Sequence, residues 1–579
     1  MTMLARTSLA LLLGAGSVVS TTLRAQSAID SAGMIVSKRG LVISSSSIAS
    51  DVGAQVLRRG GNAVDAAVAT AFALAVTYPA AGNIGGGGFM VIRLRNGMAT
   101  TIDYRERAPL GSTRRMYLDS SGKIDRRLTA TGYLAPGVPG TVRGLALAHR
   151  KYGKLPWREV VMPAAELATR GFLLDSSLAR GLAREVAQAM EPYPSSVATY
   201  GKPGGATWQP GDTLVLADLG RTLRAIATRG PNVFYTGWIA DSIAAEMSRN
   251  GGLISKKDLA AYRAKERAPV QGTFRGYRIV SMPPPSSGGV AMIEILNILS
   301  HFDLASQGRW SPETLHLMIE SMRRAYVDRA RFLGDPDFVK VPVATLTSPK
   351  YGATLAARID RGKATSSVEL GKDIVSAANV ATESEETTHF SVVDRNGNAV
   401  ANTFTLEGGY GSHVVVRGAG FLLNNEMGDF NKKPGDTNVQ GDIGTAANLI
   451  APGKRMLSSM TPTIVTRNGR LFMITGSPGG RTIINTVTQV VLNATGFHMN
   501  AREAVDAPRL HHQWLPDVAT FERDALPDST AARLRAMGHT VDEQRGRQGD
   551  AHTIIFDAKT RTAYGANDRR SSDSKASAP

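Results

Sequence analysis

Two β-rich runs around an Asn-Gly turn constrain the fold of this chain more than any other stretch. The first run, 387–394, reads TTHFSVVD, and the second, 399–406, reads AVANTFTL. Both are rich in residues that favour strands, and the intervening RNGN at 395–398 favours a tight turn. The sequence therefore predicts a β-hairpin whose first strand is central in a sheet and begins at Thr387.

Thr387 gains a chemical role if the chain is cut between Glu386 and Thr387. The new α-amine, with a pKa of about 7.7–8.0, can accept the proton of the adjacent hydroxyl, so an N-terminal threonine carries its own base. Residues 364–386 are rich in Ser, Ala and Glu and lack apolar periodicity, which is typical of an exposed segment ending at a cleavage point. Taken alone, however, the stretch is explained more simply as a buried hairpin strand.

Composition limits the classes of function. The net charge is +18, but the basic residues are scattered and no module interleaves them with aromatic side chains, so nucleic acid is not an expected partner. The chain has no cysteine, which excludes disulfides, thiolate nucleophiles and Cys-based metal sites. Histidines occur without a metal-ligand spacing such as His-Glu-x-x-His, and we expect neither a catalytic metal nor another cofactor.

The N-terminus has the pattern of a secretory signal. Arg6 precedes an apolar run at 9–19 that is too short to span a bilayer and ends in small residues. We expect a signal peptide at 1–25, cleaved at about 25–27, and hence a periplasmic or secreted protein. An uncleaved membrane anchor is the alternative. No later stretch is long and apolar enough to be a transmembrane helix.

Four consecutive glycines at 85–88 lead into a predicted strand. The Gly-Lys-Ser/Thr ending of a phosphate loop is missing, so close backbone packing explains these glycines better. Arg105 follows that strand and is either a surface residue or a carboxylate-binding residue. The polar end of the chain, 566–579, is expected to be disordered.

Other segments have the periodicity of regular structure. We predict strands at 41–48, 277–282, 463–466 and 471–475, and helices at 51–59, 63–76, 141–151, 290–300, 312–331 and from about 481 to 494, with further helices through much of 157–265. The helix at 312–331 carries Glu320, Arg323, Arg324, Asp328 and Arg331, a charge set typical of a solvated or salt-bridged face.

Nine motifs together resemble the γ-glutamyltranspeptidase (glutathione hydrolase) family, over roughly residues 35–570. They are GNAVDAA at 61–67, NIGGGG at 83–88, RE at 105–106, PPSSGG at 284–289, TTHFSVVD at 387–394, LNNEM at 423–427, LSSMTPT at 457–463, GSPGG at 476–480 and PRLHHQW at 508–514. The resemblance implies an α+β N-terminal-nucleophile hydrolase fold with four αββα layers. It also implies a precursor that cuts itself into a large subunit, 26–386, and a small subunit, 387–579, which remain together as a heterodimer.

The resemblance further implies the chemistry of the site. Thr387 would attack a γ-glutamyl amide, for example that of glutathione, and the acyl-enzyme would pass the glutamyl group to water, an amino acid or a peptide. Thr405 would orient the nucleophile, and the N–H groups of Gly479 and Gly480 would form the oxyanion hole. The residues matching the binding site for the amino-acid head group are Arg105, Ser458 and Ser459 for the α-carboxylate and Glu407, Glu426 and Asp429 for the α-ammonium.

Three positions depart from the family pattern. Glu407 stands where several members have Asn, Gly428 replaces a common Asp, and Gln440 replaces a frequent aromatic residue in a lid-length loop at 434–447. These departures leave open how the pocket is gated and how hydrolysis compares with transfer.

Three rival interpretations remain. The first is a related acylase, of the cephalosporin acylase or poly-γ-glutamate depolymerase type, with the same nucleophile. The second is an inactive binding protein on this scaffold, and the third is a polyanion binder. The set formed by Arg105, Glu407 and Asp429 favours a γ-glutamyl donor over the first rival.

Overall fold

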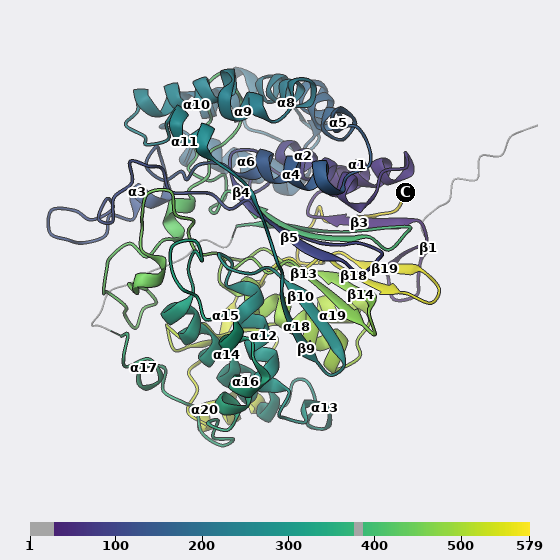
Figure 1. Ribbon diagram of the computed structural model, residues 1–579, viewed down its shortest axis with the longest axis vertical. Helices are drawn as coiled ribbons and strands as arrows, with labels where there is room; N and C mark the ends of the chain where they lie inside the picture. Colours follow the sequence, from purple (N-terminus) through teal and green to yellow (C-terminus); the bar gives the residue numbers. More distant parts are fainter. Residues whose placement is uncertain (1–27, 376–385) are drawn as a thin grey trace, which may run out of the picture.

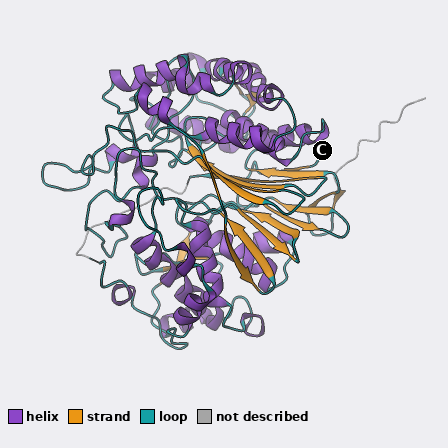
Figure 2. Ribbon diagram, viewed as in Figure 1, coloured by secondary structure: helices purple, strands orange, loops and turns teal. Residues whose placement is uncertain are grey.

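Two antiparallel β-sheets lie face to face at the centre of the molecule, and helices cover the outer face of each sheet (Figure 1). The computed structural model describes residues 28–375 and 386–579. The strands form two adjacent layers between an upper and a lower group of helices (Figure 2). The α+β fold with four αββα layers, expected from the resemblance, is confirmed.

The upper sheet contains the predicted hairpin. Its seven strands, in spatial order, are β20 (Lys575–Ser577), β3 (Gly40–Ser44), β11 (Thr388–Asp394), β12 (Ala399–Thr405), β4 (Gly87–Arg93), β5 (Ala99–Asp103) and β8 (Lys265–Arg267). Strand β11 lies between β3 and β12, and Thr388 pairs with Phe404, so the start of β11 lies beside the end of β12. The prediction of a central strand is confirmed, and the strand begins at Thr388, one residue after the candidate nucleophile.

The lower sheet packs against the inner face of the upper one. Its eight strands, in spatial order, are β1 (Ala28–Ile29), β2 (Ile35–Ser37), β19 (Thr562–Ala566), β18 (Thr553–Asp557), β14 (Arg470–Thr475), β13 (Thr463–Arg467), β10 (Tyr277–Ser281) and β9 (Val270–Phe274). Val91 and Val393 from the upper sheet meet Ile464 and Ile554 from the lower one in an apolar layer. Both faces of β11 are therefore buried, which fixes its register.

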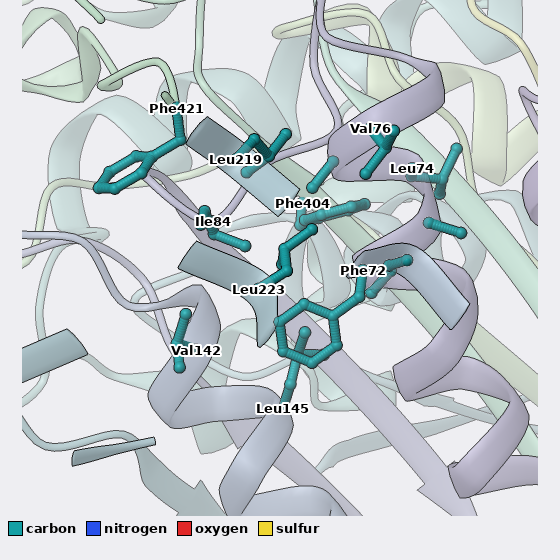
Figure 3. Packing of buried hydrophobic residues seen from close by; sticks show 14 of the residues in the cluster. Phe72, Leu74, Val76, Ile84, Val142, Leu145, Leu219, Leu223, Phe404 and Phe421 are labelled. Carbon is teal, nitrogen blue, oxygen red and sulfur yellow. The ribbon is translucent and has the colours of Figure 1, made fainter. Parts of the chain in front are cut away.

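The upper helices pack on the outer face of the first sheet. They include α1 (Ser47–Arg58), α2 (Ala63–Thr77), α4 (Thr141–Tyr152), α5 (Trp157–Arg170) and α8 (Ala217–Arg229). All residues of α2 are buried, and its many alanines allow close approach of its neighbours. Figure 3 shows Phe72 of α2 packed between Leu145 of α4, Leu223 of α8 and Phe404 of β12, which connects the helical layer to the hairpin.

The lower helices include α12 (Gly288–Leu299), α14 (Pro312–Phe332), α16 (Pro349–Ala356) and α18 (Thr482–Gly496). For the charge set on α14 the structure selects the salt-bridged alternative, and the solvated one is wrong. Glu320 is buried and pairs with Arg324 at 2.5 Å and with Arg323 at 3.2 Å. Helix α14 packs against α12 and α20 (Asp528–Ala536), most of its residues are buried, and its buried charges are stabilised by pairing.

The remaining described elements are short connections or lie at the periphery. They are α3 (Arg127–Ala130), β6 (Phe172–Leu173), α6 (Ser176–Gln188), α7 (Pro194–Tyr200), β7 (Thr213–Leu214), α9 (Asn232–Thr236), α10 (Trp238–Arg249), α11 (Lys256–Ala261), α13 (Leu304–Gln307), α15 (Val343–Leu346), α17 (Ser367–Leu370), α19 (Ala501–Asp506), β15 (Leu510–His511), β16 (Ala519–Glu522) and β17 (Val541–Arg545). In the described part of the chain, no helix combines the length and the apolar character needed to cross a membrane.

Two predictions of local structure are wrong, one for the strand at 41–48 and one for the end of the chain. The strand expected at 41–48 ends at Ser44, and α1 begins at Ser47. The Ser44 hydroxyl donates to the carbonyl of Ser46 at 2.9 Å, and such side-chain bonds compete with strand pairing. The end of the chain, expected to be disordered, instead adds β20 to the sheet beside β3, near the C-terminus marked in Figure 1.

The glycines at 85–88 allow close backbone packing, as predicted. A Cβ atom at Gly86 would lie 2.1 Å from the carbonyl oxygen of Thr405, and one at Gly88 would lie 2.4 Å from that of Thr403. This close approach lets β4 pair with β12 up to its end. Residues 1–27 and 376–385, which include the predicted signal peptide and part of the segment 364–386 before the cleavage point, lie outside the described residues.

Candidate active site

One small pocket brings together most of the residues expected from the resemblance. Its cavity has a volume of about 30 Å³ in the uncut chain, room for a water molecule or two. Nine expected residues line it: Arg105, Thr387, Thr405, Glu407, Glu426, Asp429, Ser458, Ser459 and Gly480. Met460 and Ile483 also line the pocket, and the sequence did not single them out because apolar residues there carry no chemical signal.

Two threonine hydroxyls converge on the peptide bond before Thr387. The Thr387 hydroxyl donates to the carbonyl oxygen of Glu386 at 2.7 Å, and the Thr405 hydroxyl donates to the same oxygen at 2.9 Å. Thr387 and Thr405 are almost completely buried, whereas the side chain of Glu386 is exposed. The arrangement places a nucleophilic oxygen beside a carbonyl group that a second hydroxyl polarises.

The backbone around Thr405 is fixed on both sides. The side chain of Asn83 donates to the Thr405 carbonyl at 2.9 Å, and the backbone N–H of Glu407 donates to the Thr405 hydroxyl at 2.8 Å. Glu407 has φ +82°, a conformation that is uncommon for residues other than glycine. This turn brings the Glu407 side chain to the pocket at the end of β12.

Gly479 and Gly480 form the turn that enters α18. Their φ angles are +130° and +55°, and a Cβ atom at Gly479 would lie 2.4 Å from the Thr482 hydroxyl. Gly480 lines the pocket, whereas its neighbour Gly479 is not among the lining residues. A turn without side chains at the N-terminus of a helix presents backbone N–H groups to a developing negative charge.

A buried guanidinium forms the opposite wall of the pocket. The Arg105 side chain pairs with Glu426 at 2.5 Å and makes a short contact with Asp429. Glu426 and Asp429 belong to a 3₁₀ turn (Glu426–Asp429), and Arg105 follows β5. The resemblance assigned these side chains to two ends of a substrate, and the structure joins them in one network.

Glu106 adds a third acidic side chain to this network; it belongs to the RE motif at 105–106, but the resemblance assigned it no role. It is fully buried and lies 3.7 Å from the Arg105 guanidinium, and neither carboxylate oxygen has a hydrogen-bond partner among the described residues. Burial raises the pKa of Glu106 to about 8, although Arg105 opposes the rise. Burial likewise holds the pKa of Glu426 well above its usual range.

These carboxylates keep the guanidinium charged. Burial alone lowers the pKa of Arg105, but Glu426, Asp429 and Glu106 outweigh it and raise that pKa above its usual value. The guanidinium fork is suited to a carboxylate, and a further cation beside these acidic side chains would lower their raised pKa values and favour their charged forms. The wall can therefore hold both charges of an amino-acid head group.

Ser458 and Ser459 are positioned by α14 and by the loop before α12. The Arg329 guanidinium donates to the Ser459 hydroxyl at 3.0 Å and to the Ser287 hydroxyl at 2.9 Å. The backbone N–H of Ser287 donates to the Ser458 carbonyl at 2.7 Å. The PPSSGG motif thus supports the pocket through Ser287, and Arg329 is a supporting residue that the sequence analysis did not name.

The histidines near the site are neutral structural groups. His389 is fully buried, bonds to Thr403 at 2.8 Å, and has a pKa held well below its usual value by burial and by His552. Burial lowers the pKa of His511 to about 3 and that of His512 to about 4. None of the three lines the pocket that contains Thr387.

A buried threonine at the start of a central strand, between two sheets covered by helices, defines an N-terminal-nucleophile hydrolase. Comparison with known proteins gives the family. The sequence profile described as Gamma-glutamyltranspeptidase matches residues 49–578, and this chain belongs to the γ-glutamyltranspeptidase family.

Individual relatives agree with this assignment. The chain is 48% identical over 536 residues to the glutathione hydrolase proenzyme of Escherichia coli (strain K12), covering 93% of this chain and 91% of the relative. The solved cephalosporin acylase from Bacillus halodurans superposes with a TM-score of 0.81 at 26% identity, covering 94% and 97% of the two chains. A solved chain of Helicobacter pylori gamma-glutamyltranspeptidase is 45% identical, with a TM-score of 0.56, and covers 57% of this chain and 94% of its own length.

Proposed function

We propose that this protein is a self-processing γ-glutamyltransferase and glutathione hydrolase that uses Thr387 as its nucleophile. One observation carries the proposal: the hydroxyls of Thr387 and Thr405 meet at the Glu386 carbonyl, in the same pocket as Arg105. The 48% identity to a glutathione hydrolase proenzyme supports the γ-glutamyl chemistry.

The first reaction is cleavage of the chain itself. The Thr387 oxygen attacks the carbonyl carbon of Glu386, its proton passes to the Thr387 nitrogen, and the C–N bond breaks to leave an ester. Breaking the C–N bond frees the α-amine of Thr387, and water then hydrolyses the ester to give a carboxylate on Glu386 and restore the Thr387 hydroxyl. The hydrogen bond from Thr405 to the Glu386 carbonyl stabilises the negative charge that develops on that oxygen.

The second reaction uses the same hydroxyl on a donor. The free α-amine of Thr387 takes the proton of its hydroxyl, and the hydroxyl oxygen attacks the γ-carbonyl of the donor. The C–N bond of the donor then breaks, and the donor's amine leaves with the proton that the α-amine had taken. The N–H groups of Gly479 and Gly480 stabilise the oxyanion. Water or the amino group of an amino acid or peptide then releases the glutamyl group.

The head group of the donor is held by the charged wall of the pocket. Arg105 binds the α-carboxylate together with the hydroxyls of Ser458 and Ser459, and Glu407, Glu426 and Asp429 surround the α-ammonium. Because Arg105 already contacts Glu426 and Asp429, the two ends of the head group enter one charge network. A donor that lacks the α-carboxylate or the α-ammonium leaves the side chains that would pair with that group without a partner of opposite charge.

The two products of self-cleavage, 26–386 and 387–579, are proposed to stay associated as a heterodimer. Strand β11 of the small subunit pairs with β3 of the large one, and β12 pairs with β4. In the lower sheet β13 of the small subunit pairs with β10. Separation would therefore break hydrogen bonds in both sheets and expose the apolar layer between them.

The N-terminal apolar run supports a proposal of export, with a signal peptide at 1–25 and a periplasmic or secreted protein, tethered if the segment is not removed. Cell fractionation, with N-terminal sequencing of the large subunit, tests this proposal. A large subunit that begins at residue 1 in the cytoplasm would contradict it.

Anilide substrates test the substrate class and the rival acylase. Glutaryl anilide keeps the carboxylate of γ-glutamyl anilide but lacks the α-ammonium. We expect kcat/KM for the γ-glutamyl compound to be higher by about a hundredfold or more, because loss of a buried charge-assisted contact costs several kcal/mol. Equal or faster turnover of the glutaryl compound would favour the acylase function.

A further inference from the structure

A second hollow lies away from the pocket of Thr387, beside the end of α19, which is labelled in Figure 1. We call it the arginine hollow, and its lining residues are Asp506, Glu522, Arg523, Gly546, Arg547, Arg569 and Arg570. Its cavity volume is about 630 Å³, within the range of small-molecule sites. None of its lining residues takes part in the proposed γ-glutamyl chemistry.

The floor of the arginine hollow is rigid and neutral. Arg570 donates to both carboxylate oxygens of Glu522 at 2.6 Å, and to Asp568 at 3.2 Å. Arg509 pairs with Asp568 from the other side at 2.6 Å. Two buried arginines and two buried carboxylates thus satisfy each other and hold the hollow in shape.

The rim of the arginine hollow carries excess positive charge. Arg569 pairs with Asp506 at 3.0 Å, but Asp506 is shared with Arg502 at 3.1 Å. Arg523 and Arg547 are exposed, and within residues 28–375 and 386–579 neither forms an ion pair. More guanidinium groups than carboxylates therefore face one cavity.

The rim is also anchored to the floor. The Arg547 side chain donates to the backbone carbonyl of Arg570 at 2.5 Å, and the backbone N–H of Arg523 donates to the carbonyl of Arg545 at 2.9 Å. A side chain that is held in place, as that of Arg547 is, loses less entropy when a ligand binds.

We propose that the arginine hollow binds a phosphate group, carried either by a small phosphorylated molecule or by the headgroup of an anionic lipid. The planar fork of arginine pairs with two oxygens of a phosphate, and several such forks around one cavity fit a group with charge and acceptors on every side. A doubly charged phosphate supplies the negative charge that the rim lacks.

The first test uses inorganic pyrophosphate as the probe in a calorimetric titration of the processed protein. The wild type should bind pyrophosphate saturably, and the double variant Arg523→Gln/Arg547→Gln should bind it at least about tenfold more weakly, because charge-assisted hydrogen bonds are lost. The matched control is Arg221→Gln/Arg224→Gln, which removes two exposed arginines of α8 and the same net charge. It should bind like the wild type.

The second arm identifies the source of the phosphate. Co-sedimentation with phosphatidylglycerol vesicles, compared with phosphatidylcholine vesicles, should be lost in the hollow variant alone if the group belongs to a lipid. Pyrophosphate binding without vesicle binding identifies a soluble ligand. Hydrolysis of γ-glutamyl anilide should be unchanged in both double variants. A failure of the phosphate-binding proposal can therefore be told apart from a failure of the proposed γ-glutamyl activity.

Two results would overturn the proposal. One is the absence of saturable pyrophosphate binding to the wild type at low salt. The other is an equal loss of binding in the hollow variant and in the α8 control, which would attribute the binding to the overall charge of +18.

Discussion

The Thr405 hydroxyl donates a hydrogen bond of 2.9 Å to the carbonyl oxygen of Glu386, the residue that precedes the nucleophile. The Thr387 hydroxyl donates to the same oxygen at 2.7 Å. Two threonines at the adjacent ends of β11 and β12 therefore meet at the peptide bond to be cut. The hairpin register, with Thr388 opposite Phe404, places them there.

Removing the Thr405 hydroxyl should slow self-cleavage. In Thr405→Ala the Glu386 carbonyl loses a donor that stabilises its developing charge, and we expect processing to be slower by about 10²–10³-fold. Thr405→Ser keeps the hydroxyl and serves as the control. A time course of the intact chain on denaturing gels measures the rate, and processing of Thr405→Ala at the wild-type rate would contradict this role.

Replacing Arg105 by lysine should weaken donor binding although the charge is kept. A single ammonium cannot make the forked contacts that a guanidinium makes, so we expect kcat/KM for γ-glutamyl anilide to fall by about a hundredfold. The matched control is Arg107→Lys, since Arg107 bonds to the Gly453 carbonyl outside the pocket. Similar losses in both variants would show that the effect is structural.

Glu106 should make stability depend on pH. Burial raises its pKa from a usual 4.5 to about 8 in the folded protein, so between these values the folded state holds a proton that the unfolded state has released. Stability is therefore lost as pH rises through this window, at up to about 1.4 kcal/mol per pH unit from this group. The free energy of unfolding of the wild type and Glu106→Gln, measured at intervals from pH 5 to 8.5, checks the slope.

Glu106→Gln keeps the shape of the side chain and removes its titration. The slope should be shallower in this variant, with a remainder from Glu426, whose pKa is also raised by burial. Parallel curves for the two proteins would mean that Glu106 is ionised throughout the range.

Deleting the end of the chain should destabilise the protein. Residues 575–577 pair with β3, and Lys575 and Ser577 both bond to Asp51. We expect deletion of 575–579 to lower the free energy of unfolding by about 1–3 kcal/mol, while Lys575→Ala, which removes only a solvent-exposed ion pair, has little effect. Thermal unfolding of the three proteins tests this, and an unchanged Tm after deletion would contradict it.

The sequence predicted the helices and strands that are determined by residues close together in the chain. The hairpin follows from the turn at 395–398 and the two flanking runs, and α2 follows from its run of alanines and valines. By contrast, β20 joins the sheet through backbone pairing at an edge, which a polar composition does not reveal. The buried charges of α14 likewise depend on helices that are distant in sequence.

The candidate site could be predicted only through the resemblance to a known family. Its residues come from separate segments around Arg105, Thr387, Thr405, Glu426 and Gly480, and no local pattern places them in one pocket. Glu106 and Arg329 were missed because their importance comes from burial and from their neighbours. The link between Arg105 and Glu426 also appears only in three dimensions.

The most direct test of the account is N-terminal sequencing of the smaller band from purified wild type, Thr387→Ala and Thr387→Ser on a denaturing gel. We predict a wild-type fragment that begins Thr-Thr-His-Phe, slower cleavage of Thr387→Ser at the same bond, and an intact Thr387→Ala chain. A folded wild type that stays intact, or cleavage of Thr387→Ala at the same bond, would contradict self-processing by Thr387.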